Sequence, residues 1–454
     1  MTPAARNVIL GAPFDPYRLT NNAAAYSLAG AAGDSTYLVD GSNRLYYVAD
    51  RSGNSAVNGL VLPGTSGNYA STPDAAPVQL TGNIDIRVMV ALSDWTPAGT
   101  QALVAKWVGA SRGYQFAVDP TGKLQFLGSL NGSSSGINVL STVAPTVSDY
   151  GTLWVRVTRA TSSGDVIFYT SNDGSTWTKL GNTVSATSGA LFTSTAALVV
   201  GAESDGAFSR SIGIFHRAQV RNNILDDGTG IVFDANFTAV SKLATSFTES
   251  SSNAATVTIN QTAIALPARI HGARDLYQGL TASMPTFSVS GGYNIATFDG
   301  TADYLKSAPF SLSQPESVYF TGSQVTWTLN DYLFDGDGSS VMQVAQLPAS
   351  SPTLQMRGGG TAGGDNNDLV AATRGVVRAI FNGASSTIGV NRVAGVANAS
   401  SGTSASNGFT LAARGNATQF GNITWSEALL RSAADADALQ LRIAAFEMRK
   451  WGVS

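Results

Sequence analysis

The sequence contains no cysteine and only two histidines among its 454 residues. Without thiols, the chain cannot form disulfides, iron–sulfur clusters, thiolate zinc sites or a cysteine nucleophile. Charged residues are also scarce, at 13%, which is well below the usual share for globular domains. The 27 basic residues are scattered and are balanced by 30 acidic ones, for a net charge of -3. This pattern predicts no nucleic-acid partner.

Long apolar runs are missing as well. No stretch approaches the roughly 18 consecutive apolar residues that a membrane-spanning helix needs. Near the N-terminus, the apolar run at residues 8–10 is short and is followed by Gly11 and Pro13, so it does not resemble the core of a signal peptide. We therefore expect neither membrane insertion nor a secretory leader. A chain of this kind that works outside a cell needs another route of release.

The residues that are abundant favour β-structure. The chain has 48 glycines and 43% hydrophobic residues, and it is rich in serine, threonine, alanine and valine, which favours strands and turns over surface helices. From residue 84 to 90, apolar side chains alternate with Asp85, Arg87 and Met89, the period of a half-buried strand. Similar runs follow at 101–108, 114–118, 123–127, 154–158, 166–170, 197–200, 212–220, 231–237 and 255–259. Many short strands separated by turns predict β-sandwiches.

The length predicts two or three domains. Residues 1–42 contain Pro3, Pro13 and Pro16 and an Ala/Gly-rich run, and we expect them to form an irregular N-terminal arm. The predicted sandwiches cover 43–265 and 266–454. Segments of the second half match segments of the first in the same order, which indicates a divergent duplication of one sandwich: 69–73 with 304–308, 154–157 with 376–379, 198–201 with 409–412, and 212–215 with 423–425.

One helix is predicted, at the end of the chain. Its apolar stripe at helical spacing consists of Leu439, Ile443 and Phe446. Ser432 is the expected N-cap, with Asp435 completing an acidic variant of the capping box, and Gly452 is the expected stop signal. We expect the stripe to pack on the second sandwich, and the alternative is a subunit interface.

Several segments resemble a known fold family. They are 67–74 (GNYASTPD), 80–87 (LTGNIDIR), 94–97 (DWTP), 153–158 (LWVRVT), 168–177 (FYTSNDGSTW), 296–305 (ATFDGTADYL) and 443–452 (IAAFEMRKWG). They resemble the laminin G-like version of the concanavalin A-like jelly roll, in particular the laminin G-like domains of tail and other surface proteins of bacteriophages. The resemblance implies an all-β fold of two tandem jelly-roll sandwiches, preceded by the arm and closed by the helix.

The resemblance also implies a role. We expect a structural or adhesive protein on the surface of a phage particle, as a tail, fibre, spike or head-decoration component. It would be made in the host cytoplasm and attached to other virion proteins through residues 1–42. A homo-oligomer, with a trimer as the guess, fits the symmetry of such particles. Host-surface polysaccharide is the expected ligand class.

No motif predicts catalysis. Glycan hydrolysis needs a pair of carboxylates, and the glycanases of this jelly roll carry them as Glu-x-Asp-x-x-Glu, which the sequence lacks. His216 and His271 have no visible catalytic partner, so structural roles are expected for both. The alternative function is a polysaccharide depolymerase, which measurable cleavage of a host capsule would reveal. A bacterial adhesin is the third hypothesis, and the missing export signal argues against it.

Few residues stand out as ligand sites. Residues 171–177 (SNDGSTW) match the Asp-box pattern of sialidases, and we expect a structural hairpin there, pinned to the sheet by Trp177. No cofactor is expected apart from calcium, which the resemblance implies as the one ion candidate; the candidate ligands are Asp335, Asp337, Asp365 and Asp368. Trp95 lies in a loop-like segment and is the candidate for sugar stacking.

Overall fold

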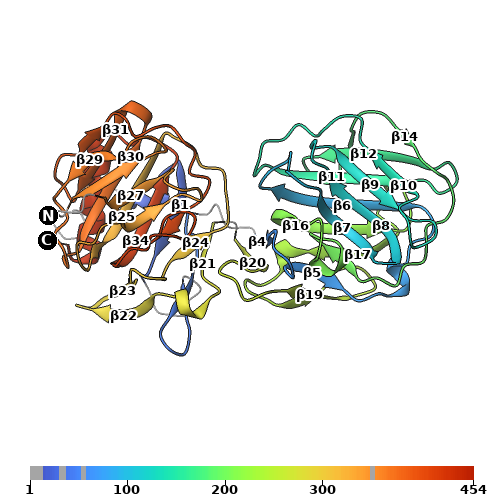
Figure 1. Ribbon diagram of the computed structural model, residues 1–454, viewed down its shortest axis with the longest axis horizontal. Coiled ribbons are helices and arrows are strands. Elements are labelled where there is room, and N and C mark those ends of the chain that lie inside the picture. The colour runs from blue at the N-terminus through green and yellow to red at the C-terminus, as the bar shows by residue number, and fades with distance from the viewer. Residues whose placement is uncertain (1–13, 30–36, 53–57, 273, 348–352, 454) are drawn as a thin grey trace, which may run out of the picture. The chain divides into compact units, whose positions relative to one another are not determined.

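Strands account for most of the regular secondary structure in the described residues. The computed structural model describes residues 14–29, 37–52, 58–272, 274–347 and 353–453 (Figure 1). Four antiparallel sheets and one α-helix, α2 (Asp437–Trp451), make up this part of the chain, and they confirm the predicted all-β, two-sandwich fold. Short 3-10 helices are η1 (Pro16–Arg18), η2 (Ala76–Val78), η3 (Ser204–Gly206), η4 (Phe237–Ala239), η5 (Thr281–Ser283) and η6 (Gly383–Ser385). Within the described ranges, no helix has the length and apolar character to cross a membrane.

The chain divides into two compact units at positions other than those expected. Ala56–Ala273 form one unit, and Met1–Ser55 together with Arg274–Ser454 form the other. We call them the inserted unit and the flanking unit. The predicted boundaries at 42 and 265 are therefore corrected. Strand patterns locate strands but do not show which sheet a strand joins.

The inserted unit consists of two sheets. The first, which we call the outer-face sheet, contains β13 (Thr178–Lys179), β12 (Asp165–Ser171), β11 (Thr152–Arg159), β6 (Ile84–Leu92), β16 (Ile212–Arg221), β4 (Asn58–Pro63) and β20 (Arg269–Gly272) in this order, with β14 (Val184–Ser185) on β12 and β17 (Ile231–Asn236) on β16. The second contains β10 (Ile137–Leu140), β9 (Leu124–Gly128), β8 (Ser111–Val118), β7 (Gln101–Val108), β15 (Leu198–Val200), β5 (Tyr69–Thr72), β19 (Thr256–Asn260) and β18 (Ser246–Thr248).

The flanking unit also consists of two sheets. The first contains β22 (Thr286–Ser290), β23 (Tyr293–Thr297), β34 (Ile423–Arg431), β25 (Glu316–Gln324), β30 (Gly375–Phe381), β31 (Ser386–Val390) and β32 (Val396–Asn398), with β1 (Asn22–Ser27) on β34. The second contains β2 (Tyr37–Val39), β3 (Leu45–Val48), β21 (Leu276–Tyr277), β24 (Leu305–Ser307), β33 (Thr410–Leu411), β26 (Asp331–Asp335), β27 (Gln343–Gln346), β28 (Leu354–Arg357) and β29 (Gly363–Asn366).

The two units repeat the same strand order. In the inserted unit the first sheet runs β12-β11-β6-β16, and in the flanking unit it runs β31-β30-β25-β34. The second sheets run β7-β15-β5 and β26-β33-β24. The matched sequence segments fall on these equivalent strands, so the predicted internal correspondence is confirmed.

Alternation along the strands builds the core of the inserted unit. Ile84, Ile86 and Val88 on β6 are fully buried and belong to one hydrophobic cluster with Phe116 and Phe126 of the opposite sheet. Each such side chain contributes about 1.5–3 kcal/mol when it is buried. The intervening β6 residues therefore lie on the other face of the sheet, away from this core.

The N-terminal segment is not an irregular arm where the structure describes it. β1 pairs with β34, with Asn22 opposite Arg431 and Ser27 opposite Glu427. β2 pairs with β3, which in turn pairs with β21. Ala24 and Tyr26 are buried in the core of the flanking unit. Prolines and small residues at the start of the chain hid these short strands, and residues 1–13 lie outside the described part.

The C-terminal helix packs as expected but begins differently. α2 starts after Ala436, which provides no side-chain cap, and ends at Gly452 in the left-handed conformation. The Ser432 hydroxyl donates to the carbonyl of Asn21 instead of capping. Asp435 accepts hydrogen bonds from Arg431 and Tyr319, so the predicted capping box is wrong. The ion pair with Arg431 and the hydrogen bond from Tyr319 use the carboxylate that the capping pattern assigned to the helix.

Two glutamates are buried where α2 meets β34. Glu427 accepts hydrogen bonds from Lys450 and Trp451. Glu447 is 1% exposed. Burial, and then the charge of Glu427, raises the pKa of Glu447 well above its usual range, while Lys450 opposes this rise. Glu447 is therefore protonated in the folded protein at pH values at which it is ionised in the unfolded chain.

We expect Glu447→Gln to stabilise the flanking unit at pH 8. Because the folded pKa of Glu447 is raised, the wild-type protein loses stability as the pH rises from the unfolded pKa, about 4.3, toward the folded pKa. Glutamine does not titrate, so its advantage grows by about 1.4 kcal/mol per pH unit in that window. Urea denaturation at pH 5 and pH 8 measures it. Asp437→Asn is the control and should give no gain that grows with pH, because Asp437 is an exposed carboxyl on the same helix. A Glu447→Gln variant no more stable than wild type at pH 8 contradicts the prediction.

Candidate functional site

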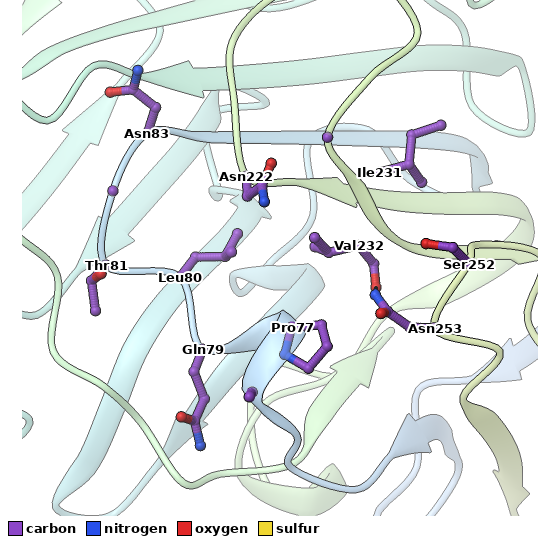
Figure 2. Close-up of a pocket in the computed structure, with 13 residues that line it drawn as sticks. Pro77, Gln79, Leu80, Thr81, Asn83, Asn222, Ile231, Val232, Ser252 and Asn253 are labelled. Carbon is purple, nitrogen blue, oxygen red and sulfur yellow. Dashed lines mark hydrogen bonds between the residues drawn. The ribbon is translucent and has the colours of Figure 1, made fainter.

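A polar cavity lies at one end of the inserted unit. Its volume is about 560 Å³, which is in the range of small-molecule sites. Four segments meet around it: η2 with the loop at 79–83, the residues at the end of β16, the start of β17, and the turn at 252–253. Figure 2 shows the 79–83 loop on one side and Ser252 and Asn253 on the other. Three connections and a strand end thus form one site.

Amides and hydroxyls dominate the lining. Its polar side chains are Gln79, Thr81, Asn83, Asn222, Ser252 and Asn253. Some of these hold the rim in place: Asn83 accepts from the amide of Thr161, and Asn253 donates to the carbonyl of Val232. Asn222 and Ser252 are exposed. No ionisable side chain is among the described residues that line the cavity. Amides and hydroxyls both donate and accept, which suits a ligand rich in hydroxyl groups.

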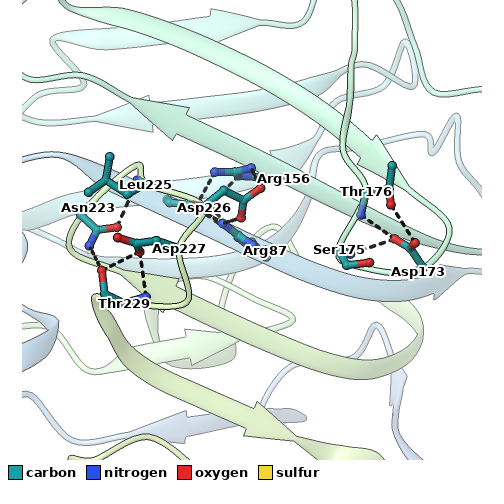
Figure 3. Close-up of polar contacts among 11 residues, drawn as sticks. Arg87, Arg156, Asp173, Ser175, Thr176, Asn223, Leu225, Asp226, Asp227 and Thr229 are labelled. Atoms are coloured by element: carbon teal, nitrogen blue, oxygen red, sulfur yellow. Dashed lines mark hydrogen bonds and ion pairs between the residues drawn. The ribbon is translucent and has the colours of Figure 1, made fainter.

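A second polar feature lies on the outer-face sheet, on the face that points away from the hydrophobic core of the inserted unit. Asp85 and Arg87 alternate with core residues on β6, and Arg156 on β11 lies opposite Arg87. Arg221, the last residue of β16, lies opposite Asp85. The strand register therefore places all four side chains on one face. With Asp226 from the following loop they form what we call the arginine cluster. Figure 3 shows Arg87, Arg156 and Asp226 of this cluster.

Ion pairs hold the arginine cluster together. Asp85 is fully buried and accepts from Arg87 at 2.7 Å and from Arg156 at 2.9 Å. Asp226 bridges the same two guanidinium groups, at 2.8 Å from Arg87 and 3.4 Å from Arg156. The side chain of Asp226 is 48% exposed. The cluster has three guanidinium groups and two carboxylates, for a net charge of +1.

The Asp-box hairpin closes one side of the cluster. Asp173 accepts from the amides of Ser175 and Thr176, and Gly174 takes a positive φ at the turn. These amides lower the pKa of the Asp173 carboxyl. The hairpin sets Trp177 edge-on against Trp154, at 6.2 Å between ring centroids. Trp177 also receives the guanidinium groups of Arg87 and Arg156 at 5.3 and 5.4 Å from its ring centroid, within cation–π range. The predicted pinning of the hairpin by Trp177 is confirmed.

The charges act on Asp226 and Arg221 in opposite ways. Partial burial favours the neutral form of Asp226, but the hydrogen bond from Arg87 and the nearby arginine charges lower its pKa overall. Burial, and then repulsion from Arg87, lowers the pKa of Arg221. Arg221 is 6% exposed, and its Nε and Nη1 have no hydrogen-bond partner in the described part of the chain.

Trp95 does not form a sugar-stacking platform. It is 4% exposed and belongs to the hydrophobic core of the inserted unit. Its indole nitrogen donates to the carbonyl of Gly151, and its amide donates to Asp149. The loop therefore folds the ring inward, because burial of a large aromatic group outweighs the loop-like character of the segment. This candidate is corrected.

The four calcium candidates do not converge. Asp335 is fully buried, and its carboxylate accepts from five backbone amides, those of Gly336, Ser340, Val341, Met342 and Gly415. Asp337 pairs with Lys306 at 2.7 Å. Asp365 accepts from Gln355, and Asp368 from Asn366. Within the described ranges, no group of three or more His, Cys, Asp or Glu residues is placed to hold a metal ion. The amide donors give Asp335 a structural role.

Comparisons with known proteins concern the fold alone. No family model and no curated protein matches the sequence. A proposed carbohydrate-binding protein of Bacteroides ovatus aligns over 44% of this chain and 57% of its own length, at 8% identity and a TM-score of 0.33. The chain thus spans just over half of that protein. Laminin G-like domains 4–5 of the mouse laminin α1 chain align over 89% of this chain and 92% of their own length, at 11% identity and a TM-score of 0.31. The carbohydrate-binding module of Ruminococcus gnavus IT-sialidase aligns over 38% and 96%, at 11% identity and a TM-score of 0.29.

Proposed function

We propose that this chain is a non-catalytic glycan-binding protein, and that the cavity of the inserted unit is its binding site. The observation that carries this proposal is the lining of the cavity, in which amide and hydroxyl groups converge without an ionisable side chain. Sugar hydroxyls are recognised by groups that donate and accept together. Pro77 and Ile231, which are partly exposed, add apolar surface beside these groups (Figure 2), against which the C–H face of a sugar ring can pack.

Binding without cleavage follows from the same lining. Glycan hydrolysis requires two carboxyl groups about 5–10 Å apart on either side of the scissile bond. The described residues around the cavity include no aspartate or glutamate. A ligand held there meets neither a general acid nor a nucleophile. The depolymerase alternative therefore has no support from this site.

The setting of this binding activity is the surface of a bacteriophage particle, as a tail, fibre, spike or head-decoration component. This part of the proposal rests on the resemblance of segments such as 67–74 and 168–177 to laminin G-like domains of phage surface proteins. Immunogold labelling of intact particles tests it, and particles without label would overturn it. Symmetric oligomers are common among such parts, and size-exclusion chromatography with light scattering tests the trimer.

Substitutions in the cavity test the binding proposal. We expect Asn222→Ala and Ser252→Ala each to weaken glycan binding by about fivefold to tenfold, since each removes one hydrogen bond worth about 1 kcal/mol. Both side chains are exposed, so stability should change little. The measurement is titration calorimetry with a glycan selected from an array of host-surface polysaccharides. Reducing-end analysis of the same mixtures reports any cleavage.

Asn182→Ala is the matched control, because Asn182 is an exposed asparagine of the same unit and does not line the cavity. Binding that falls in the cavity variants and not in this control supports the proposal. Equal affinity in the wild type, the two cavity variants and the control would mean that the glycan binds outside the cavity. Released product would overturn the non-catalytic assignment.

A further inference from the structure

Arg221 differs from its equivalent in the flanking unit. Arg221 ends β16, and Arg431 ends the equivalent strand β34. Arg431 has partners for the same two nitrogens: its Nε donates to Asp435 at 2.7 Å, and its Nη1 donates to Asn22 at 2.7 Å and to the carbonyl of Thr20 at 3.0 Å. The side chain of Arg221 is only 6% exposed, and its Nε and Nη1 have no hydrogen-bond partner among the described residues. A buried guanidinium in this state is costly unless a ligand or water satisfies it.

The two units also differ in the segment that covers the sheet surface around these arginines. In the flanking unit, the chain after β34 forms α2, which packs on β25 and β30, and Gln440 of α2 accepts from Arg378. Arg378 is the positional equivalent of Arg156. In the inserted unit, the chain after β16 forms only a loop, which we call the 222–230 loop. The arginine cluster therefore lies under a short loop where its equivalent lies under a helix.

Among the described residues, Asp226 is the side chain of the 222–230 loop that forms ion pairs with the sheet. At its base, the amide of Asn222 donates to the carbonyl of Gly230 at 2.9 Å. At its tip, Asp226 pairs with Arg87 and Arg156 (Figure 3). Other side-chain hydrogen bonds stay inside the loop, such as those from Thr229 to Asp227. Leu225 beside Asp226 is 57% exposed. The carboxylate of Asp226 thus lies at the tip of an exposed loop, and its ion pairs with Arg87 and Arg156 hold that tip against the sheet.

We propose that the arginine cluster is a second subsite for the glycan, which binds the carboxylate of an acidic sugar in place of Asp226. This inference rests on the proposed glycan binding and names its ligand class. Asp226 shows that a carboxylate fits between Arg87 and Arg156. A ligand carboxylate uses the same two donors and gains Arg221, whose free nitrogens Asp226 leaves unused.

The electrostatics favour this exchange. When Asp226 leaves, three guanidinium groups face the single carboxylate of Asp85, and the cluster carries a charge of +2. Arginine forks bind carboxylates with paired, charge-assisted hydrogen bonds. These are stronger in a site that is partly shielded from water. Asn222 and Gly230, the two ends of the 222–230 loop, also line the cavity, so displacement of the tip links the cluster to the binding site.

The test compares two neighbouring aspartates in the full-length protein. The probes are trigalacturonate and its methyl ester, which has the same ring but no charge. Asp226→Asn removes the competing charge, and we expect it to lower the Kd for trigalacturonate about tenfold. Asp227→Asn makes the same change in charge on the adjacent side chain, which bonds Thr229 within the loop. The charge of Arg221 is the smallest of the influences on Asp227, so this variant should leave the Kd within about twofold. Adding Arg221→Gln to Asp226→Asn should abolish the gain.

The outcomes separate the two proposals. A gain confined to Asp226→Asn and to the charged probe supports the acidic-sugar subsite. Equal effects of Asp226→Asn and Asp227→Asn, or an equal gain for the methyl ester, overturn it, whether or not neutral glycans bind the cavity. A gain for trigalacturonate together with cavity variants that bind glycans as the wild type does would leave the subsite standing and overturn the proposed cavity. Calorimetry at two salt concentrations checks the charge dependence.

Discussion

Replacing Asp85 with alanine is expected to lower the free energy of unfolding of the inserted unit by about 3–5 kcal/mol. Asp85 is fully buried and accepts hydrogen bonds from both Arg87 and Arg156. Its removal leaves two buried guanidinium groups that share only the half-exposed Asp226. Breaking a buried ion pair from one side is costly, because the other charge stays buried without compensation.

The measurement is urea denaturation followed by tryptophan fluorescence, since Trp154 and Trp177 lie beside the cluster. Asp94→Ala is the control, because the hydrogen bonds that Asp94 accepts in the described part of the chain come from Thr96, and it should cost less than about 1 kcal/mol. If Asp85→Ala unfolds at the same urea concentration as this control, the arginine cluster does not stabilise the sheet as described.

Replacing Asp335 with alanine is expected to destabilise the flanking unit by about 3–5 kcal/mol, without any dependence on calcium. Five backbone amides donate to this buried carboxylate. Burial raises the pKa of Asp335, and the amides oppose that rise. Alanine leaves the donors buried without an acceptor, which is the costly way to lose a hydrogen bond.

The measurement is thermal unfolding in calcium and in EDTA. For the wild type, and likewise for the Asp335→Ala variant, the unfolding temperature in calcium should equal the unfolding temperature in EDTA. Asp337→Ala provides the comparison, since its partly exposed pair with Lys306 contributes at most about 1 kcal/mol. An unfolding temperature of the wild type that rises with calcium and no longer does so in Asp335→Ala would restore the calcium hypothesis.

Much of the fold followed from local patterns. Alternation along β6 and along β7 predicted strands whose inward faces form the core. Matched segments in the two halves predicted the repeated strand order. The N-terminal strands escaped prediction because β1 is short and contains three consecutive alanines. Its membership of the flanking unit depends on β34, which lies at the far end of the chain.

The site was harder to predict than the fold. Asp85 and Arg87 were visible as an alternating pair, but their partners Arg156 and Asp226 come from other parts of the sequence, and only strand register brings them together. The cavity gathers segments from four places in the chain. The prediction that Trp95 is an exposed stacking surface was wrong, because a polar, Pro-containing segment can still fold an aromatic ring into the core. Residue type alone does not reveal which way a loop side chain points.

The interleaved architecture sets an order of events during synthesis. Asn22 of β1 lies opposite Arg431 of β34, 409 positions later. A ribosome that adds about 5–20 residues per second needs roughly 20–80 s to cover that distance. The inserted unit is translated as one continuous stretch within that interval and can fold as it emerges, whereas β1 waits for its neighbour. A nascent chain stalled before β34 would therefore carry a finished sandwich and an unsatisfied strand, the kind of edge that chaperones bind.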